Sequence, residues 1–97
     1  MLQNFTATST ANSTVNIIPT QSNELLLLSL YLNGGENGGN VTINFPNGFT
    51  AKFTIEAEDT VALDSKIVIP AGSILSFNAD AAGIKAMAST TLSLADV

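Results

Sequence analysis

The sequence predicts an all-β protein, a small antiparallel β-sandwich of the jelly-roll or immunoglobulin-like type. Apolar and polar residues alternate with a period of two in several short segments, most regularly from Phe49 to Glu56. Turns rich in glycine, proline and asparagine separate these segments, as is typical of small sandwiches. Residues 25–32 carry no charge and are apolar on both faces of a strand, so this strand has to be covered on both sides.

The N-terminal segment is the least apolar part of the chain. It is rich in Thr, Ser and Asn, and Leu2 and Phe5 are the only large apolar residues between Leu2 and Asn12. We predict that residues 1–13 form an extended N-terminal arm or an edge strand, ordered with the help of a neighbouring chain. Residues 14–97 are predicted to form a single β-sandwich domain, because a chain of 97 residues is long enough for one core and too short for two.

A β-hairpin is predicted where the leucine-rich segment meets a glycine-rich one. A regular strand divides residues 25–32 between two faces. One face holds Leu26, Leu28, Leu30 and Leu32, and the other holds Leu25, Leu27, Ser29 and Tyr31. Residues 33–39, Asn-Gly-Gly-Glu-Asn-Gly-Gly, supply positive-φ positions for the connection, which we expect at Gly34 and Gly38.

Further strands are predicted in the second half of the chain. Phe53 alternates with Lys52 and Thr54, which places Phe53 in the core and Lys52 on the surface. Strands are also expected at residues 66–69, 75–79 and 84–88. Between the first two, Pro70-Ala71-Gly72 predicts a type II turn with proline at its second position.

Charge and composition exclude several classes of partner. The chain contains no cysteine, histidine, tryptophan or arginine, and three lysines stand against eight carboxylates, for a net charge of −5. An acidic surface repels phosphate groups, so we expect neither nucleic acid nor an anionic membrane as a partner. The longest apolar run is also much shorter than the roughly 20 residues of a transmembrane helix.

No catalytic, cofactor-binding or metal-binding residue is predicted. Glu56 and Glu58 would share one face of a strand, which favours a solvated strand edge over two carboxylates facing each other across a cleft. No histidine or cysteine is present to activate a serine, so we do not expect an enzyme. A small hydrolase is the least favoured alternative.

Two modifications of this picture stay open. The cluster of Glu58, Asp59 and Asp64 offers hard oxygen ligands for calcium, although it lacks an alternating acidic loop with a central glycine. Three Asn-x-Ser/Thr triplets leave glycosylation open as well. They begin at Asn4, Asn12 and Asn40.

Two blocks of the sequence resemble small virion proteins of tailed phages. In residues 14–45, Thr-Val-Asn-Ile-Ile-Pro, then Leu-Leu-Ser-Leu-Tyr-Leu-Asn, a glycine-rich turn and Val-Thr-Ile look like their first half. Residues 66–90, beginning Lys-Ile-Val-Ile-Pro-Ala-Gly-Ser-Ile-Leu-Ser-Phe, resemble their closing hairpin. The resemblance implies a β-sandwich displayed on a phage particle, commonly as a capsid decoration (cement) protein, and it carries over no catalytic residue. The Thr/Ser/Asn-rich N-terminal segment departs from the pattern.

The expected function is therefore that of a non-enzymatic virion protein. It would stabilise the phage head by binding the major capsid protein across capsomers on the outer surface of the capsid. The alternative is a carbohydrate- or receptor-binding module of a phage tail or fibre. A chain this small needs help to cover the leucine-rich strand, so we expect a homo-oligomer, a trimer. The predicted interface residues are Leu2, Phe5, Leu25, Leu27 and Tyr31.

Overall fold

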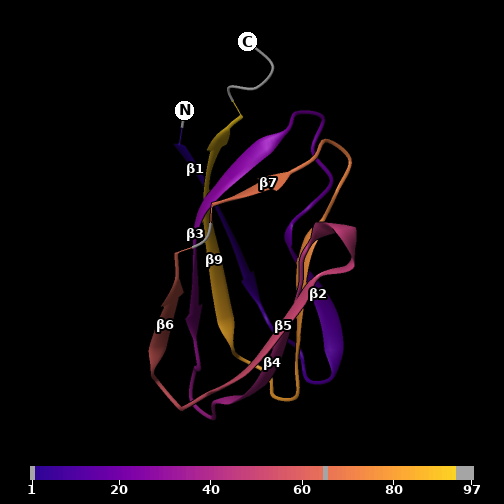
Figure 1. Ribbon diagram of the computed structural model, residues 1–97. Coiled ribbons are helices and arrows are strands. Elements are labelled where there is room, and N and C mark those ends of the chain that lie inside the picture. Colours follow the sequence, from indigo (N-terminus) through magenta and orange to yellow (C-terminus); the bar gives the residue numbers. More distant parts are fainter. Residues whose placement is uncertain (1, 65, 94–97) are drawn as a thin grey trace.

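The computed structural model describes residues 2–64 and 66–93, which form two antiparallel sheets packed face to face (Figure 1). The elements in chain order are β1 (Leu2–Thr8), β2 (Ser13–Ile18), β3 (Leu25–Asn33), β4 (Gly39–Asn44), the short 3₁₀ helix η1 (Pro46–Gly48), β5 (Thr50–Ile55), β6 (Thr60–Leu63), β7 (Ile67–Ile69), β8 (Leu75–Ala79) and β9 (Lys85–Leu92). Sheet A has the strand order β1-β9-β3-β6, with β7 also pairing with β3, and sheet B has the order β2-β8-β4-β5. None of the described helical residues makes a segment long and apolar enough to cross a membrane.

The strand pairing is that of a jelly roll. β4 pairs with β5, β3 with β6 and β7, β2 with β8, and β1 with β9, so the pairs are nested around the turn between β4 and β5. Rolling up such a ribbon sends successive pairs alternately to the two sheets, which is the observed arrangement. The predicted β-sandwich is confirmed. Of the two predicted types, jelly roll and immunoglobulin-like, the strand pairing is that of the jelly roll.

Strand β3 changes its inward-facing set of residues halfway along its length. Its register with β9 shifts between Leu27 and Ser29, as a β-bulge requires. Leu25 and Leu27 point into the core before the bulge, and Leu30 and Leu32 do so after it. The predicted regular alternation is therefore wrong for this strand. The four leucines, expected on two faces, line a single core.

The core lies between the inner faces of the two sheets. Phe77, at the centre of β8, is fully buried. Its cross-strand neighbours are Ile43 on β4 and Val15 on β2. Alternate residues of the other strands complete the core, as their period-two patterns predict. Every buried side-chain nitrogen or oxygen in the described residues has a hydrogen-bond partner.

The N-terminal segment is an edge strand of its own domain. β1 pairs with β9 of the same chain along its whole length. The segment is therefore ordered by its own domain, and not by a neighbouring chain as predicted. Ser9, which follows β1, is buried; its hydroxyl accepts a hydrogen bond from the N–H of Ile84 at 2.9 Å and donates one to the C=O of Ala81 at 2.7 Å. These bonds fix the end of β1 to the turn between β8 and β9.

The turn after β7 differs from its prediction by one residue. The N–H of Ser73 donates a hydrogen bond to the C=O of Pro70 at 3.0 Å, so proline is the first residue of the turn. Gly72 is the third, and its φ of 83° is the conformation that a type II turn requires there.

We predict a graded loss of stability for three substitutions. Phe77→Ala empties a fully buried site and should lower the free energy of unfolding by about 3 to 5 kcal/mol. Phe53 faces the core but is only half-buried on the edge strand β5, so Phe53→Ala should cost less, and Lys52→Ala on the outer face should be nearly silent. Denaturant titrations followed by circular dichroism measure this order. Equal losses for Phe53→Ala and Lys52→Ala would contradict the inward orientation of Phe53.

Candidate functional site

Most of the charge lies at one end of the sandwich. Successive strands run in opposite directions except for β6 and β7, which are both antiparallel to β3. The turns after β1, β3, β5 and β8 therefore lie together, at the bottom of Figure 1. These turns carry five of the eight carboxylates, and we call this the acidic end. They belong to Glu36, Glu56, Glu58, Asp59 and Asp80.

The opposite end, where the termini lie, exposes apolar side chains. On the outer face of sheet A, Leu26 lies opposite Val68 on one side and Thr91 on the other, and Leu2 lies opposite Thr91. Leu2 is 71% exposed and Val68 is 47% exposed. This apolar row therefore crosses the sheet from β1 to β7. Further exposed apolar residues at this end are Phe49, Ile74 and Leu92.

The five predicted interface residues do not form one surface. Leu2 is exposed at the apolar end, whereas Tyr31 is half-buried on the outer face of sheet A, toward the acidic end. Phe5 is half-buried and packs against the core. Leu25 and Leu27 lie in the core with 3% and 0% exposure, so their assignment to an outer interface is wrong. The bulge in β3 is the reason, because it lets both halves of the strand turn leucines inward.

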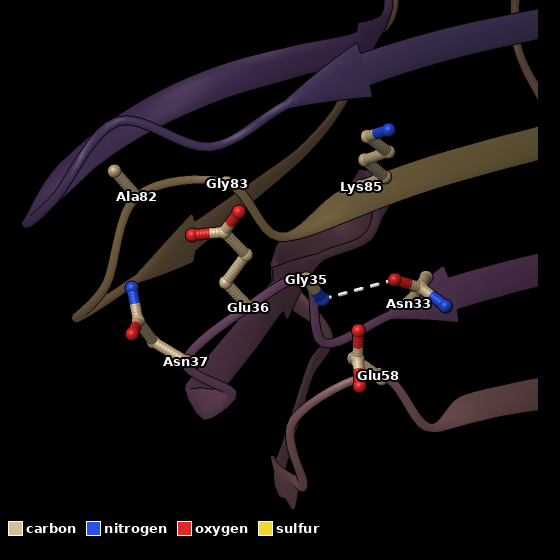
Figure 2. Close-up of a pocket in the computed structure, with 8 residues that line it drawn as sticks. All are labelled: Asn33, Gly35, Glu36, Asn37, Glu58, Ala82, Gly83 and Lys85. Carbon is tan, nitrogen blue, oxygen red and sulfur yellow. Dashed lines mark hydrogen bonds between the residues drawn. The ribbon is translucent and has the colours of Figure 1, made fainter.

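The acidic end contains a polar cavity of about 550 Å³, which we call the loop pocket (Figure 2). Three connections and the start of β9 surround it. The loop after β3 contributes Glu36 and Asn37, the turn after β5 contributes Glu58, and Lys85 is the first residue of β9. Asn33, Gly35, Ala82 and Gly83 complete the lining.

The glycines hold the loops around this pocket close together. The N–H of Gly34 donates to the C=O of Asp59 at 2.9 Å, and the N–H of Glu58 donates to the C=O of Gly35 at 2.7 Å. A Cβ at Gly34 would collide with the carbonyl oxygen of Glu56, and a Cβ at Gly35 with that of Gly83. The positive φ that the sequence predicts at Gly34 occurs instead at Gly35, so Gly34 is required by the close approach of two backbones.

Glu58 occupies a backbone conformation that glycine adopts more easily. Glu56 and Glu58 are the first and third residues of the turn after β5, which the N–H of Asp59 closes by donating to the C=O of Glu56 at 3.2 Å. They therefore do not share a strand face as predicted, and φ at Glu58 is 61°. A left-handed backbone costs an ordinary L-residue roughly 1 to 2 kcal/mol. The surrounding hydrogen bonds therefore hold a carboxylate at the pocket in spite of local strain.

The residues considered for calcium are not assembled into a site. Glu58 and Asp59 precede β6, and Asp64 follows it and faces Lys66, at 3.8 Å between the carboxylate and the ammonium group. Within residues 2–64 and 66–93, no group of three or more acidic, histidine or cysteine side chains is arranged to hold a metal ion.

A second cavity of about 370 Å³ continues from the loop pocket onto the outer face of sheet A. We call it the outer groove. Tyr31 and Met87, which are paired across β3 and β9, lie in it, and it shares Asn33 and Lys85 with the loop pocket. Its other lining residues include Thr6, Thr8 and Thr60. The sequence identified Tyr31 as an interface residue but gave no signal for Asn33, Lys85 or Met87, because only the register between β3 and β9 brings them together.

Comparisons with known proteins support the fold alone. No family model matches the chain, and no curated protein matches it. Among solved structures, the chain is similar to one described as Bacillus endospore appendages that form a novel family of disulfide-linked pili. The TM-score is 0.55 at 17% sequence identity, and the alignment covers 95% of this chain and 85% of the other.

We predict that Glu58→Gly stabilises the protein. The substitution removes the cost of a left-handed L-residue and should raise the free energy of unfolding by up to about 1 kcal/mol, after the entropy that glycine loses on folding. Glu56→Gly is the matched control, since Glu56 is not among the residues with positive φ, and it should be neutral or destabilising. Thermal unfolding measures both variants. A lower midpoint temperature of unfolding for Glu58→Gly than for the unsubstituted protein would contradict backbone strain at Glu58.

Proposed function

We propose that this chain is a non-enzymatic structural protein of a phage particle, a capsid decoration protein that binds across capsomers. The apolar row formed by Leu2, Leu26 and Val68 supports the proposal most directly, because it places apolar side chains on three of the four strands that it crosses, with Thr91 on the fourth, and exposed apolar patches are typical of protein interfaces. The assignment to a phage particle rests on the resemblance of residues 14–45 and 66–90 to small virion proteins of tailed phages.

The apolar end is the end that we expect to face the capsid. Burying an exposed Leu or Val is worth about 1.5 to 3 kcal/mol before ordering costs, and Leu2 and Val68 are both available for it. The acidic end would then face solvent, where its carboxylates stay hydrated. This orientation needs no ion pairing with the major capsid protein.

Association in this proposal is non-covalent. The solved structure of similar fold is described as forming disulfide-linked pili, but these 97 residues contain no cysteine. Copies of the chain would therefore be held by packing and main-chain contacts. We retain a homotrimer as the expected assembly, with its contacts at the apolar end and not at Leu25 or Leu27.

The alternative function, a carbohydrate- or receptor-binding module of a tail or fibre, is favoured by one observation. The outer groove and the loop pocket form a connected concave surface away from the apolar end. The two functions differ in abundance, because a symmetric shell repeats its decoration protein many times and a tail carries few copies.

The number of copies per particle tests the location. In phage particles whose genome encodes this chain, we expect on the order of hundreds of copies, as the symmetry of a capsid requires. Quantitative mass spectrometry against a labelled standard measures the number. A handful of copies would favour the tail module, and complete absence would exclude a virion protein.

Binding to capsid shells should depend on apolar contact and not on charge. We predict that the double variant Leu2→Gln and Val68→Gln binds empty shells more weakly than the unsubstituted chain, because both substitutions place an amide in the apolar row. Molar salt screens the attraction between exposed charges beyond about 3 Å. Binding of the unsubstituted chain should persist in molar salt, because apolar contact is not screened.

Glu56→Gln, at the acidic end, is the control and should leave shell binding unchanged. Deleting β1 is not a usable test, because its pairing with β9 is part of the fold. Co-sedimentation measures the bound fraction for each variant. Release of the unsubstituted chain by salt, or undiminished binding by the double variant, would contradict the proposed contact.

A further inference from the structure

The outer groove and the loop pocket form one continuous surface on sheet A and its loops. They share Asn33 and Lys85, which lie opposite each other on β3 and β9. Volumes of about 370 and 550 Å³ are within the range of sites for small molecules and short oligomers. The apolar row proposed to contact a capsid lies at the other end of the sheet, so this surface stays free in that arrangement.

The polar groups at the junction are held in place before any ligand arrives. Asn33 donates a hydrogen bond from Nδ2 to Oγ1 of Thr60 at 3.0 Å. It also accepts one at Oδ1 from the N–H of Gly35 at 2.9 Å, which Figure 2 shows. These two bonds fix the rotamer of Asn33 and leave its second amide hydrogen free to donate. A preorganised group loses little conformational entropy on binding.

Other polar groups around the surface have unused hydrogen-bonding capacity. Among the described residues, the Tyr31 hydroxyl has no hydrogen-bond partner and Lys85 has no carboxylate within ion-pair distance. The carboxylates of Glu36 and Glu58 are likewise without an ion-pair partner in the described part of the chain. The surface thus offers an ammonium donor, amide groups, carboxylate acceptors and one aromatic ring.

This combination matches the chemistry of a neutral sugar. Sugar hydroxyls donate and accept hydrogen bonds at once, which suits mixed amide, carboxylate and ammonium groups, and the apolar face of a pyranose packs against an aromatic ring. Across the strands, Tyr31 lies opposite Met87 on β9 and opposite the small residue Ala62 on β6, and Thr60 lines the groove with it. The small side chain of Ala62 covers less of the ring than a larger residue at that position would. The carboxylates of the acidic end disfavour an anionic ligand.

We propose that the outer groove and loop pocket together bind a neutral oligosaccharide. Tyr31 provides the stacking platform, and Asn33, Lys85 and Glu58 hydrogen-bond to the sugar hydroxyls. The carboxylate of Glu58 gives a reason for an L-residue at a position whose φ favours glycine. This site does not depend on whether the chain decorates a head or a tail.

Chemical-shift titration of isotope-labelled protein tests the proposal. The neutral probes are maltohexaose and the hexasaccharides of cellulose, chitin and mannan, and a heparin hexasaccharide is the anionic comparison. We expect at least one neutral probe to shift the amide signals of Asn33, Gly35 and Lys85 in a saturable way, and heparin to leave them unchanged. No saturable shift with any neutral probe, saturation at other residues, or preference for heparin would overturn the proposal.

Substitutions then assign the roles. Tyr31→Ala should weaken binding by about tenfold or more, while Tyr31→Phe should keep most of the affinity because the ring remains. Glu58→Gly should weaken binding while raising thermal stability, which separates loss of a contact from loss of the fold. Thr42→Ala, on the outer face of sheet B, is the control and should bind as the unsubstituted protein does. Equal affinity for Tyr31→Ala, Glu58→Gly and the control would contradict the assigned contacts.

Discussion

An uncharged leucine-rich strand is stable only when it is surrounded, and the arrangement of the sandwich follows from how β3 is covered. β9 pairs with one edge of β3, β6 and β7 share the other edge, and sheet B covers the inner face. The bulge after Leu27 keeps leucines pointing inward along the whole strand, although a strand without a bulge would turn half of them outward. The side chains that remain outside, such as Leu26 and Tyr31, then lie in the two regions of the outer face that we propose to be functional.

The sequence predicted those parts of the fold that depend on local alternation. Phe53 and Ile55 point inward on β5, where Lys52 and Thr54 identify the outer face, and Ala86 and Ala88 point inward on β9, where Lys85 and Ser89 do so. Residues 25–32 contain almost no polar residue, so every register places leucines inside and the bulge leaves no trace in the pattern. Strand order and the choice of the jelly roll depend on pairings between distant strands, which composition and periodicity do not encode.

The candidate site was harder to predict for the same reason. Its residues come from β1, β3, β6, β9 and three connections, and none of them stands out within its own segment. Asn33 and Thr60 are 27 positions apart in the chain, yet their hydrogen bond fixes the junction of the two cavities. The glycine-rich segment was correctly predicted as a connection, but its tight packing on the turns after β5 and β8 depends on backbone contacts that appear only in the folded chain.

The separation of the two ends has consequences for assembly. The molecule is 43 Å along its longest axis, several times the Debye length of about 8 to 10 Å at physiological ionic strength. The carboxylates of the acidic end therefore contribute little to contacts made at the apolar end. In the proposed attachment, burial of apolar surface is the main contribution besides main-chain contacts, and its free energy grows with area and does not fall with salt. On the proposed shell, contacts between neighbouring copies would add to each copy's contact with the capsid, so a repeating array would hold a weakly apolar chain better than a single isolated site would.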